Sequence, residues 1–211
     1  PLVLAKTLAT VDVMSKGRLN VGVGVGALKP ESDALGSTFE TRGRYADESI
    51  KIMRELWESE DPEFDGEFFS FSGVKFSPKP IQKPGPPILI GGASRAALRR
   101  VATLGDGWHP IRQSIADLKQ NIATIHSLAE EAGRDPSEIT VTVRTELDVL
   151  DSRSDVTESS MIGTADQLRT TIEQYEEIGV SELVLSVSTD DVERIQRTQD
   201  RFAAQVIHGP S

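Results

Sequence analysis

Short apolar runs of strand length alternate with amphipathic helical segments along most of the chain, and this alternation limits the fold more than any other feature. A helix is expected over residues 1–16, after which strand and helix follow one another five times. Such regular alternation predicts a parallel α/β sheet with right-handed crossovers, either open and doubly wound or closed as a (β/α)8 barrel. The expected strands are 19–25, 88–91, a short one within 107–111, 139–150 and 182–188.

One insertion interrupts the alternation between residues 61 and 80. Asp65-Gly66 is a turn signal for a hairpin, and five of the seven phenylalanines lie in this segment. We therefore expect a small β-hairpin insertion there. Because no linker or shift of composition divides the rest, residues 1–211 are predicted to form a single domain.

Composition narrows the functional classes. The net charge of −10 argues against nucleic acid or an anionic membrane as the main partner. No apolar run approaches the length of a membrane span, and the absence of cysteine excludes disulfides and thiolate chemistry. No set of His, Asp and Glu has metal-ligand spacing, so no metal site is expected. This acidic, cysteine-free composition is typical of a cytoplasmic enzyme that acts on a small molecule.

Residues 88–94 read as a buried strand that leads into a helix. Gly91 and Gly92 leave the backbone uncovered, and Ala93 and Ser94 stand where the helix begins. Exposed N–H groups at a helix start suit an anion, above all a phosphate, and Arg95 adds positive charge. The alternative is an ordinary tight turn with a serine N-cap. Two further arginines, Arg99 and Arg100, are expected on a solvated helix face.

The segment Gly22–Ala27 matches the dinucleotide fingerprint G-x-G-x-x-A, but the fingerprint requires a helix at once. No long helical pattern begins until about residue 38, so we reject that interpretation. Val25 and Gly26 are expected instead to let a flat ligand pass close to the strand end. The alternative is a strand whose small residues pack against bulky neighbours. Glu31, in the next loop, is a weak catalytic candidate against the commoner outcome of a solvated acid.

Trp108 and His109 follow a short strand, and the other two histidines do not. His109 could act as a general acid or base, or bind a cofactor phosphate, although an isolated histidine is more often without such a role. Trp108 could stack on a planar ring, but burial between strand and helix is at least as common. No catalytic residue is identified beyond His109 and Glu31 as weak candidates.

Taken together, the motifs resemble those of the bacterial-luciferase-like oxidoreductases, in particular the subgroup that uses the deazaflavin coenzyme F420 instead of FMN. The resemblance covers most of residues 1–110 and is looser beyond them. It rests on Leu4–Asp12 with Ser15–Leu19, Gly22–Gly26 with Glu31 and Gly36, Arg42–Arg44, Asp47-Glu48, Leu56-Trp57, Gly66–Phe68, Pro78–Pro80, Gln82–Pro84, Pro86-Pro87, Gly91-Gly92, Ala97–Arg100 and Gly105–Trp108.

This resemblance implies an incomplete (β/α)8 TIM barrel of the luciferase-like type, usually dimeric, with the cofactor at the carboxyl ends of the strands. The helix at 1–16 corresponds to the third helix of that barrel, so three strands would precede residue 1, in keeping with about five of eight strands counted. One departure is Ala27, where many relatives carry Trp or Glu.

The resemblance also implies hydride transfer between F420 and a small organic substrate. Residues Val25 and Gly26 would lie under the ring, the segment Gly91–Arg95 would hold the phosphate, and Trp108 and His109 would line the mouth. Two alternatives stay open: an FMN-dependent monooxygenase of the same fold, and a non-catalytic flavoprotein or partial-barrel assembly subunit. The resemblance also implies a homodimer.

Overall fold

The computed structural model describes residues 1–152 and 160–209, and the chain divides into two compact units. Unit 1 is Pro1–Gly107 and unit 2 begins at Trp108, so the boundary falls within the two-residue strand β5 (Gly107–Trp108). Both units combine parallel strands with helices, as the alternation predicts. The expectation of a single domain stays a prediction. No helix of the described ranges is long and apolar enough to cross a membrane.

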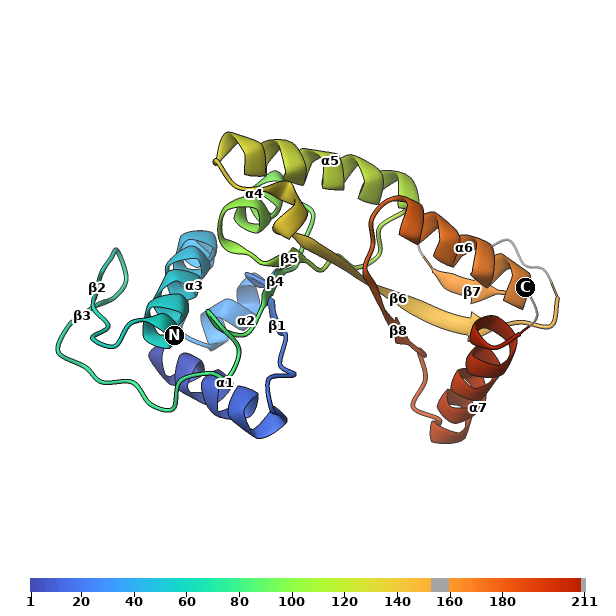
Figure 1. Cartoon of the computed structure of the whole chain (residues 1–211), viewed down its shortest axis with the longest axis horizontal. Helices are drawn as coiled ribbons and strands as arrows, with labels where there is room; N and C mark the ends of the chain where they lie inside the picture. Colours follow the sequence, from blue (N-terminus) through green and yellow to red (C-terminus); the bar gives the residue numbers. More distant parts are fainter. Residues whose placement is uncertain (153–159, 210–211) are drawn as a thin grey trace. The chain divides into compact units, whose positions relative to one another are not determined.

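Unit 1 is built on two parallel strands with helices around them (Figure 1). The β4 strand is buried along its whole length because its three residues are large and apolar. Its partner β1 is aligned so that Val21 lies opposite Ile88 and Val23 opposite Ile90. The elements are α1 (Leu2–Ser15), β1 (Val21–Val23), α2 (Lys29–Ala34), a 3-10 turn (Phe39–Thr41), α3 (Arg42–Glu58), β4 (Ile88–Ile90) and α4 (Arg95–Leu104).

Small residues allow α1 to lie close to α3. Ala5 and Ala9 are one helical turn apart and fully buried. The indole of Trp57, at the end of α3, donates a hydrogen bond to the Ala5 carbonyl at 3.1 Å. Farther along α1, the buried carboxylate of Asp12 accepts the amides of Ile81 and Gln82 at 2.8 and 3.0 Å. A single acid therefore fixes the proline-rich segment that leads to β4.

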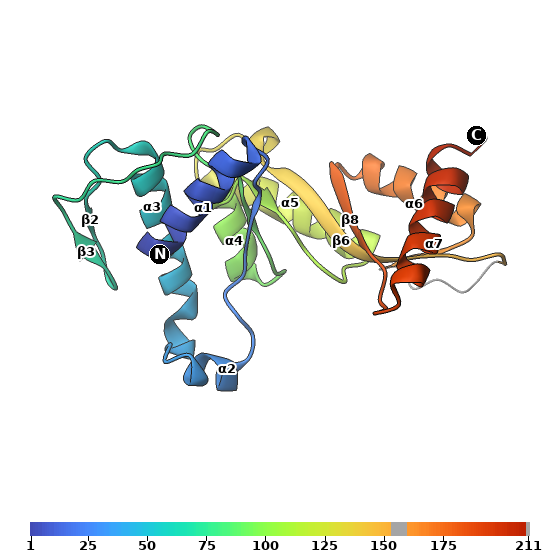
Figure 2. The ribbon, with the colours of Figure 1, turned by 90° about the horizontal axis from the view of Figure 1, so that it is seen from below.

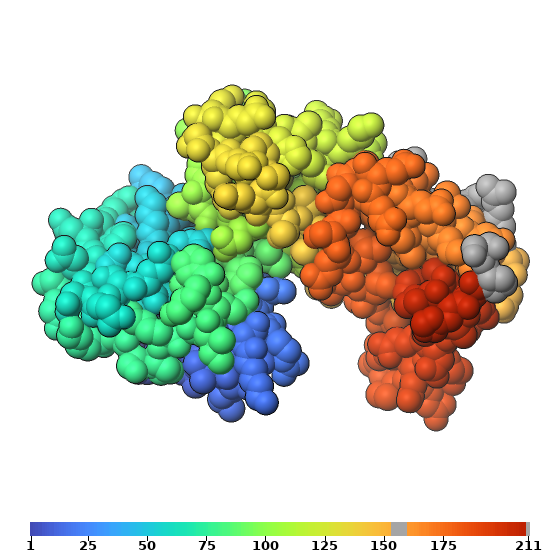
Figure 3. Space-filling model, in the orientation of Figure 1, coloured from blue at the N-terminus to red at the C-terminus, as the bar shows by residue number. Residues whose placement is uncertain are grey.

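The predicted hairpin insertion is confirmed. Strands β2 (Phe64–Asp65) and β3 (Ser70–Phe71) pair antiparallel, and the segment lies at the surface of unit 1 (Figure 3). The turn is held by Glu48 of α3, whose carboxylate accepts three consecutive backbone amides, at residues 67, 68 and 69, over 2.7–2.9 Å. A Cβ on Gly66 would lie 2.6 Å from the Glu48 carboxyl carbon, so glycine is required there.

Unit 2 is organised by its long central strand β6. Strand β8 pairs with β6 from Thr142 to Glu146, and β7 pairs with its last three residues, both parallel. Figure 1 shows α5 and α6 along one side of β6, where its buried odd-numbered residues pack. The elements are α5 (Ile115–Glu131), a 3-10 turn (Pro136–Glu138), β6 (Thr140–Val149), β7 (Met161–Gly163), α6 (Ala165–Glu177), β8 (Glu182–Ser186), α7 (Val192–Phe202) and a π-helical turn (Ala203–Ile207).

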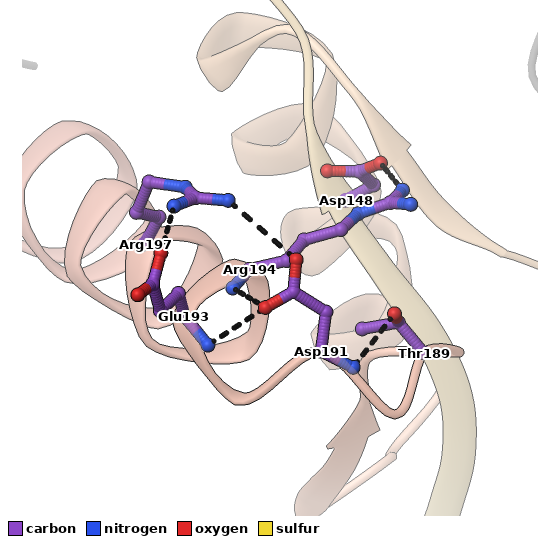
Figure 4. A network of polar contacts seen from close by, with 6 residues as sticks. All are labelled: Asp148, Thr189, Asp191, Glu193, Arg194 and Arg197. Carbon is purple, nitrogen blue, oxygen red and sulfur yellow. Dashed lines mark hydrogen bonds and ion pairs between the residues drawn. The ribbon is translucent and has the colours of Figure 1, made fainter.

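The start of α7 is tied to β6 by a network of charged groups (Figure 4). The Asp191 carboxylate caps the helix by accepting the amides of Glu193 and Arg194 at 3.0 and 3.2 Å. The Arg194 side chain reaches Asp148 of β6 at 3.0 Å, and Arg197 pairs with Glu193 at 3.4 Å. These pairs are largely exposed, so they orient α7 with little gain in stability.

Two local expectations are corrected. The loop after β1 was expected to be irregular, but it carries the short helix α2, and the next long helix begins at Arg42 instead of residue 38. Strand β7 was not expected. Its three residues are too few to show an alternation, and it forms because β6 continues beyond β8 and offers a free edge there.

Candidate functional site

The predicted phosphate turn and the glycine-rich strand end lie side by side in unit 1. Parallel strands bring their carboxyl ends to the same edge of a sheet, and the Gly91 amide donates to the Val23 carbonyl at 2.8 Å, which extends the pairing beyond β4. Val25 and Gly26 therefore leave the sheet next to the segment Gly91–Ser94. The structure brings these residues together, and their contact with a cofactor stays a prediction.

Glycine keeps the space at this edge open. A Cβ on Gly24 or Gly26 would meet no atom within 4 Å, and Gly26 has a φ of +78°. Gly92 has a φ of +92°, which L side chains rarely adopt, and is exposed. A flat ligand could thus approach the backbone closely here, whereas side chains at these positions would occupy its place.

The helix start beyond Gly92 combines a satisfied cap with free donors. The Ser94 side chain accepts the Ala97 amide at 3.2 Å, so the N-cap alternative is present. First-turn amides have no intrahelical acceptor, which leaves those of Arg95 and Ala96 for a ligand. The Arg95 side chain is exposed and has no ion pair among the described residues. An anion here would meet both the amides and a cation.

The expectation that Arg100 is solvated is wrong. Its guanidinium is 7% exposed, forms an ion pair with Asp47 and donates to the Gly43 carbonyl at 3.1 Å. Its position on the inner face of α4 turns it toward α3, whereas Arg99 is exposed as expected. Arg100 therefore joins two helices and is not part of a ligand-facing surface.

Glu31 lies in the first turn of α2, exposed, and its carboxylate has no partner in the part of unit 1 that the structure describes. Figure 2 shows α2 projecting from the rest of unit 1 at the end of the loop after β1. Lys29 and Asp33 pair across the helix at 2.8 Å, and Arg42 holds the loop by donating to the Gly26 carbonyl at 3.3 Å. Glu31 is left free, but nothing around it marks a catalytic environment.

Trp108 and His109 belong to unit 2. The indole of Trp108 is fully buried, which leaves no exposed ring face, and its contact with a cofactor stays a prediction. His109 is half-buried, and its Nδ1 shares a hydrogen bond of 2.6 Å with the hydroxyl of Thr142 on β6. This bond fixes the ring and directs Nε2 away from β6.

The charge state of His109 is set by burial and by two neighbours. Burial lowers its pKa below the ordinary 6.5, since the charged ring is poorly solvated. The Glu182 carboxylate works in the opposite direction, and the Arg144 guanidinium adds to the lowering. His109 is therefore neutral at pH 7, the form that accepts a proton.

Unit 2 contains a cavity of about 370 Å³ that is lined in part by Arg144, one of the two charged neighbours of His109. The polar groups that line it include Arg112, Arg144, Glu146, Ser186 and Ser188. Sequence reasoning missed them all. For Arg144 and Glu146 alone, a signal was present in the alternation on the strand 140–149, where charged residues occupy positions 144, 146 and 148 and share one strand face.

Comparison with known proteins decides the family. The model of the luciferase-like monooxygenases matches residues 1–161 of this chain. The chain belongs to this family. An FMNH2-dependent dimethylsulfone monooxygenase of Pseudomonas putida is 32% identical over 136 residues, 63% of this chain and 38% of that protein. An uncharacterised protein of Mycobacterium tuberculosis is 37% identical over 142 residues, 67% of this chain and 48% of that protein. The aligned part thus spans half or less of these curated luciferase-like relatives.

Solved structures show the luciferase-like fold. The monooxygenase RslO1 of Streptomyces bottropensis has a TM-score of 0.85 at 24% identity, covering 99% of this chain and 74% of that one. An F420-dependent secondary alcohol dehydrogenase, solved with an F420–acetone adduct, has a TM-score of 0.82 at 23% identity, covering 100% and 76%. The chain therefore has the α/β fold of a partial luciferase-like TIM barrel, as the resemblance implied.

Proposed function

We propose that this chain belongs to an oxidoreductase that binds coenzyme F420 and moves a hydride between this cofactor and a small organic substrate. The observation that carries the proposal is the paired strand ends of unit 1, where an open glycine backbone adjoins a helix start with free amides. Family members that use F420 or FMN support a deazaflavin or flavin at this edge. A cytoplasmic location and a homodimer are further parts of the proposal.

The residues at this edge suit such a cofactor. A Cβ on Gly24 or Gly26 would project into open space, so no atom of the chain blocks the approach of a flat ring to this backbone. The amides of Arg95 and Ala96, together with the Arg95 side chain, would hold the phosphate. The bound deazaflavin would supply the hydride chemistry, while this chain would bind and orient it.

Within unit 2, His109 is the group proposed to hold or accept the substrate proton. It is neutral at pH 7, and Thr142 keeps its ring in one orientation. Glu182 would stabilise the charged ring once it has taken up a proton, since its carboxylate raises the pKa. This arrangement fits a general base better than the free, solvated carboxylate of Glu31 does.

FMN is the second candidate cofactor, because a curated relative at 32% identity is an FMNH2-dependent monooxygenase. The two are separated by titrating the protein with F420 and with FMN, followed by cofactor fluorescence. Oxygen uptake with reduced FMN is the second readout, because a deazaflavin reacts poorly with oxygen. Preference for F420 without oxygen uptake supports the proposal, and binding of neither cofactor overturns it in favour of a non-catalytic subunit.

The place of the ring is tested by Gly24→Val. The added side chain meets no atom of the chain, so the fold should be retained while the ring is displaced. We expect cofactor affinity to fall at least ~10-fold, the loss of about 1.4 kcal/mol of binding. Gly22→Val is the matched control, since Gly22 is equally open but lies two residues farther from the strand end. Equal loss in both variants would contradict a ring at the edge.

A further inference from the structure

The cavity of unit 2 lies over the middle of β6, between two segments that end earlier. On one edge, residues 110 and 111 run beside β6, where the Arg144 amide donates to the Pro110 carbonyl at 3.2 Å and Ile111 bridges to Arg144. On the other edge, β8 pairs with β6 and ends at Ser186, opposite Glu146. Strand β6 itself continues to residue 149. Its residues 144–146 therefore line the cavity between these two flanking segments.

Two exposed arginines, Arg112 and Arg144, line this cavity. Neither Arg112 nor Arg144 makes an ion pair or a side-chain hydrogen bond in the described ranges 1–152 and 160–209. Each of the other five arginines of unit 2 in these ranges faces a carboxylate: Arg134, Arg169, Arg194, Arg197 and Arg201. Within unit 2, two unpaired guanidinium groups at one cavity stand apart from the other described arginines, and in a chain of net charge −10 they offer a positive site to a ligand.

The backbone of Arg112 supports the same conclusion. Its φ is +54°, a left-handed conformation that costs a residue with a side chain about 1 kcal/mol. Strain of this kind persists where the surrounding structure needs the side chain in one place. At this position it brings Arg112 to the wall of the cavity that Arg144 also lines.

We propose that this cavity is a binding site for an organic oxyanion, a carboxylate, sulfonate or phosphate group held by Arg112 and Arg144. Guanidinium groups bind such anions through paired N–H donors. The hydroxyl of Ser188 also lines the cavity and can donate to the anion, whereas the Ser186 hydroxyl already donates to the Thr145 carbonyl at 3.4 Å. The site belongs to unit 2 alone and does not depend on the proposed cofactor.

Glu146 gives the site its selectivity. Its carboxylate lines the same cavity and lies two residues from Arg144 on the same strand face, roughly 7 Å along β6. It repels a second negative charge, and it accepts a hydrogen bond from a hydroxyl or amino group. The occupant is therefore a small anion that also carries a donor, such as a hydroxy acid. A second acid, Glu182, lies near His109, whose pKa is also affected by Arg144.

The test is anion binding to the whole protein, measured by calorimetry with inorganic phosphate, methanesulfonate and lactate as probes. We expect millimolar binding that Arg144→Gln or Arg112→Gln weakens at least ~10-fold, since a charge-assisted hydrogen bond contributes this much. Arg197→Gln removes the same charge outside the cavity and should bind as the wild type does. Glu146→Gln should tighten binding about 3-fold by removing a repulsion across roughly 7 Å of water.

A measurement on the unmodified protein guards against misfolded variants. The Nε–H resonances of Arg112 and Arg144 should shift on titration, while that of Arg197 should not. Unchanged arginine resonances, or equal binding by all variants, would overturn the proposal.

The source of the oxyanion is distinguished by comparing FMN with riboflavin. If FMN binds more tightly than riboflavin and Arg144→Gln removes the difference, the group is the cofactor's phosphate, and the proposed phosphate site at Gly91–Arg95 is overturned. If Arg144→Gln leaves that difference intact but weakens lactate binding, the group belongs to a substrate. Both results support an oxyanion site. Failure of cofactor binding with lactate binding retained would overturn the proposed function and leave this site standing.

Discussion

The two units use their charged side chains in opposite ways. In unit 1, the buried acids Asp12 and Glu48 accept backbone amides and hold chain segments in place, and buried Arg100 joins two helices. The open edge of this unit is formed by glycines and backbone amides. In unit 2, Arg144 and Glu146 stand free at a cavity. The proposed cofactor edge of unit 1 thus offers backbone groups to a ligand, whereas the proposed anion site of unit 2 offers side chains that project from a strand.

The largest expected effect comes from removing a buried acid of unit 1. Asp12→Ala removes a buried carboxylate that accepts the part-buried amides of Ile81 and Gln82 and the Gln82 side chain, which should lower the free energy of unfolding by about 3 kcal/mol. Chemical denaturation followed by circular dichroism measures it. Asp33→Ala is the control, because Asp33 is exposed and should change stability by less than ~1 kcal/mol. A similar loss of stability in Asp12→Ala and Asp33→Ala would contradict the conclusion that buried acids hold the segments of unit 1 in place.

The next effect separates a structural cap from a ligand contact. Ser94 caps α4 and Ser114 caps α5 in the same way, by accepting an amide three residues later. Replacing either serine by alanine should cost about 1 kcal/mol of stability. Only Ser94→Ala should also weaken cofactor binding, measured by fluorescence titration. Equal cofactor affinity in the two variants would remove Ser94 from the proposed phosphate site.

The third prediction concerns the two charged residues that affect the pKa of His109 in unit 2. Glu182→Gln removes the charge that favours the protonated ring and should lower the His109 pKa further, whereas Arg144→Gln should raise it. NMR titration of the ring protons measures both shifts. Shifts in the same direction in the two variants would contradict this electrostatic arrangement.

The same histidine predicts a pH dependence of stability. Since the pKa is lowered on folding, the unfolded chain binds the proton more readily. Its contribution is fully present above the ordinary value of 6.5 and is lost as the pH falls through 6.5 toward the folded pKa. His109→Gln should therefore flatten the acid side of the stability profile, recorded by thermal unfolding between pH 5 and 8.

The smallest expected effect concerns the surface pairs of unit 2. Arg194→Gln breaks the contact with Asp148, in which the arginine side chain is 52% exposed. The free energy of unfolding should change by about 0.5 kcal/mol, and less in high salt. A loss as large as that of Asp12→Ala would show that the two units do not differ in how charges contribute to stability.

Sequence reasoning succeeded where the pattern is local. Thr164 and Gln167 have the three-residue spacing of a capping box in the sequence, and the structure forms it at the start of α6. The phenylalanine-rich segment forms the expected hairpin. It failed where a residue's partner is distant in sequence. Arg100 could not be assigned to the interior because Asp47 lies 53 residues away.

The two candidate sites differ in the same way: one is marked by a local sequence pattern, and the other depends on residues that are distant in sequence. The glycine edge of unit 1 was visible because glycine next to a strand is a local signal for an open backbone. Arg112 and Arg144 are ordinary arginines in sequence, and only the pairing of residues 110–111 and β8 with β6 brings them to one cavity.

The way Glu48 holds the hairpin has a consequence for how this region can vary. Its carboxylate binds three main-chain amides and none of the side chains that follow Gly66. The side chains of the tip add to this anchor, because Glu67 pairs with Arg44 at 3.1 Å and the rings of Phe68 and Phe69 pack against Tyr45. Substitutions at residues 67–69 should therefore loosen the hairpin without detaching it, as long as Glu48 and Gly66 are kept.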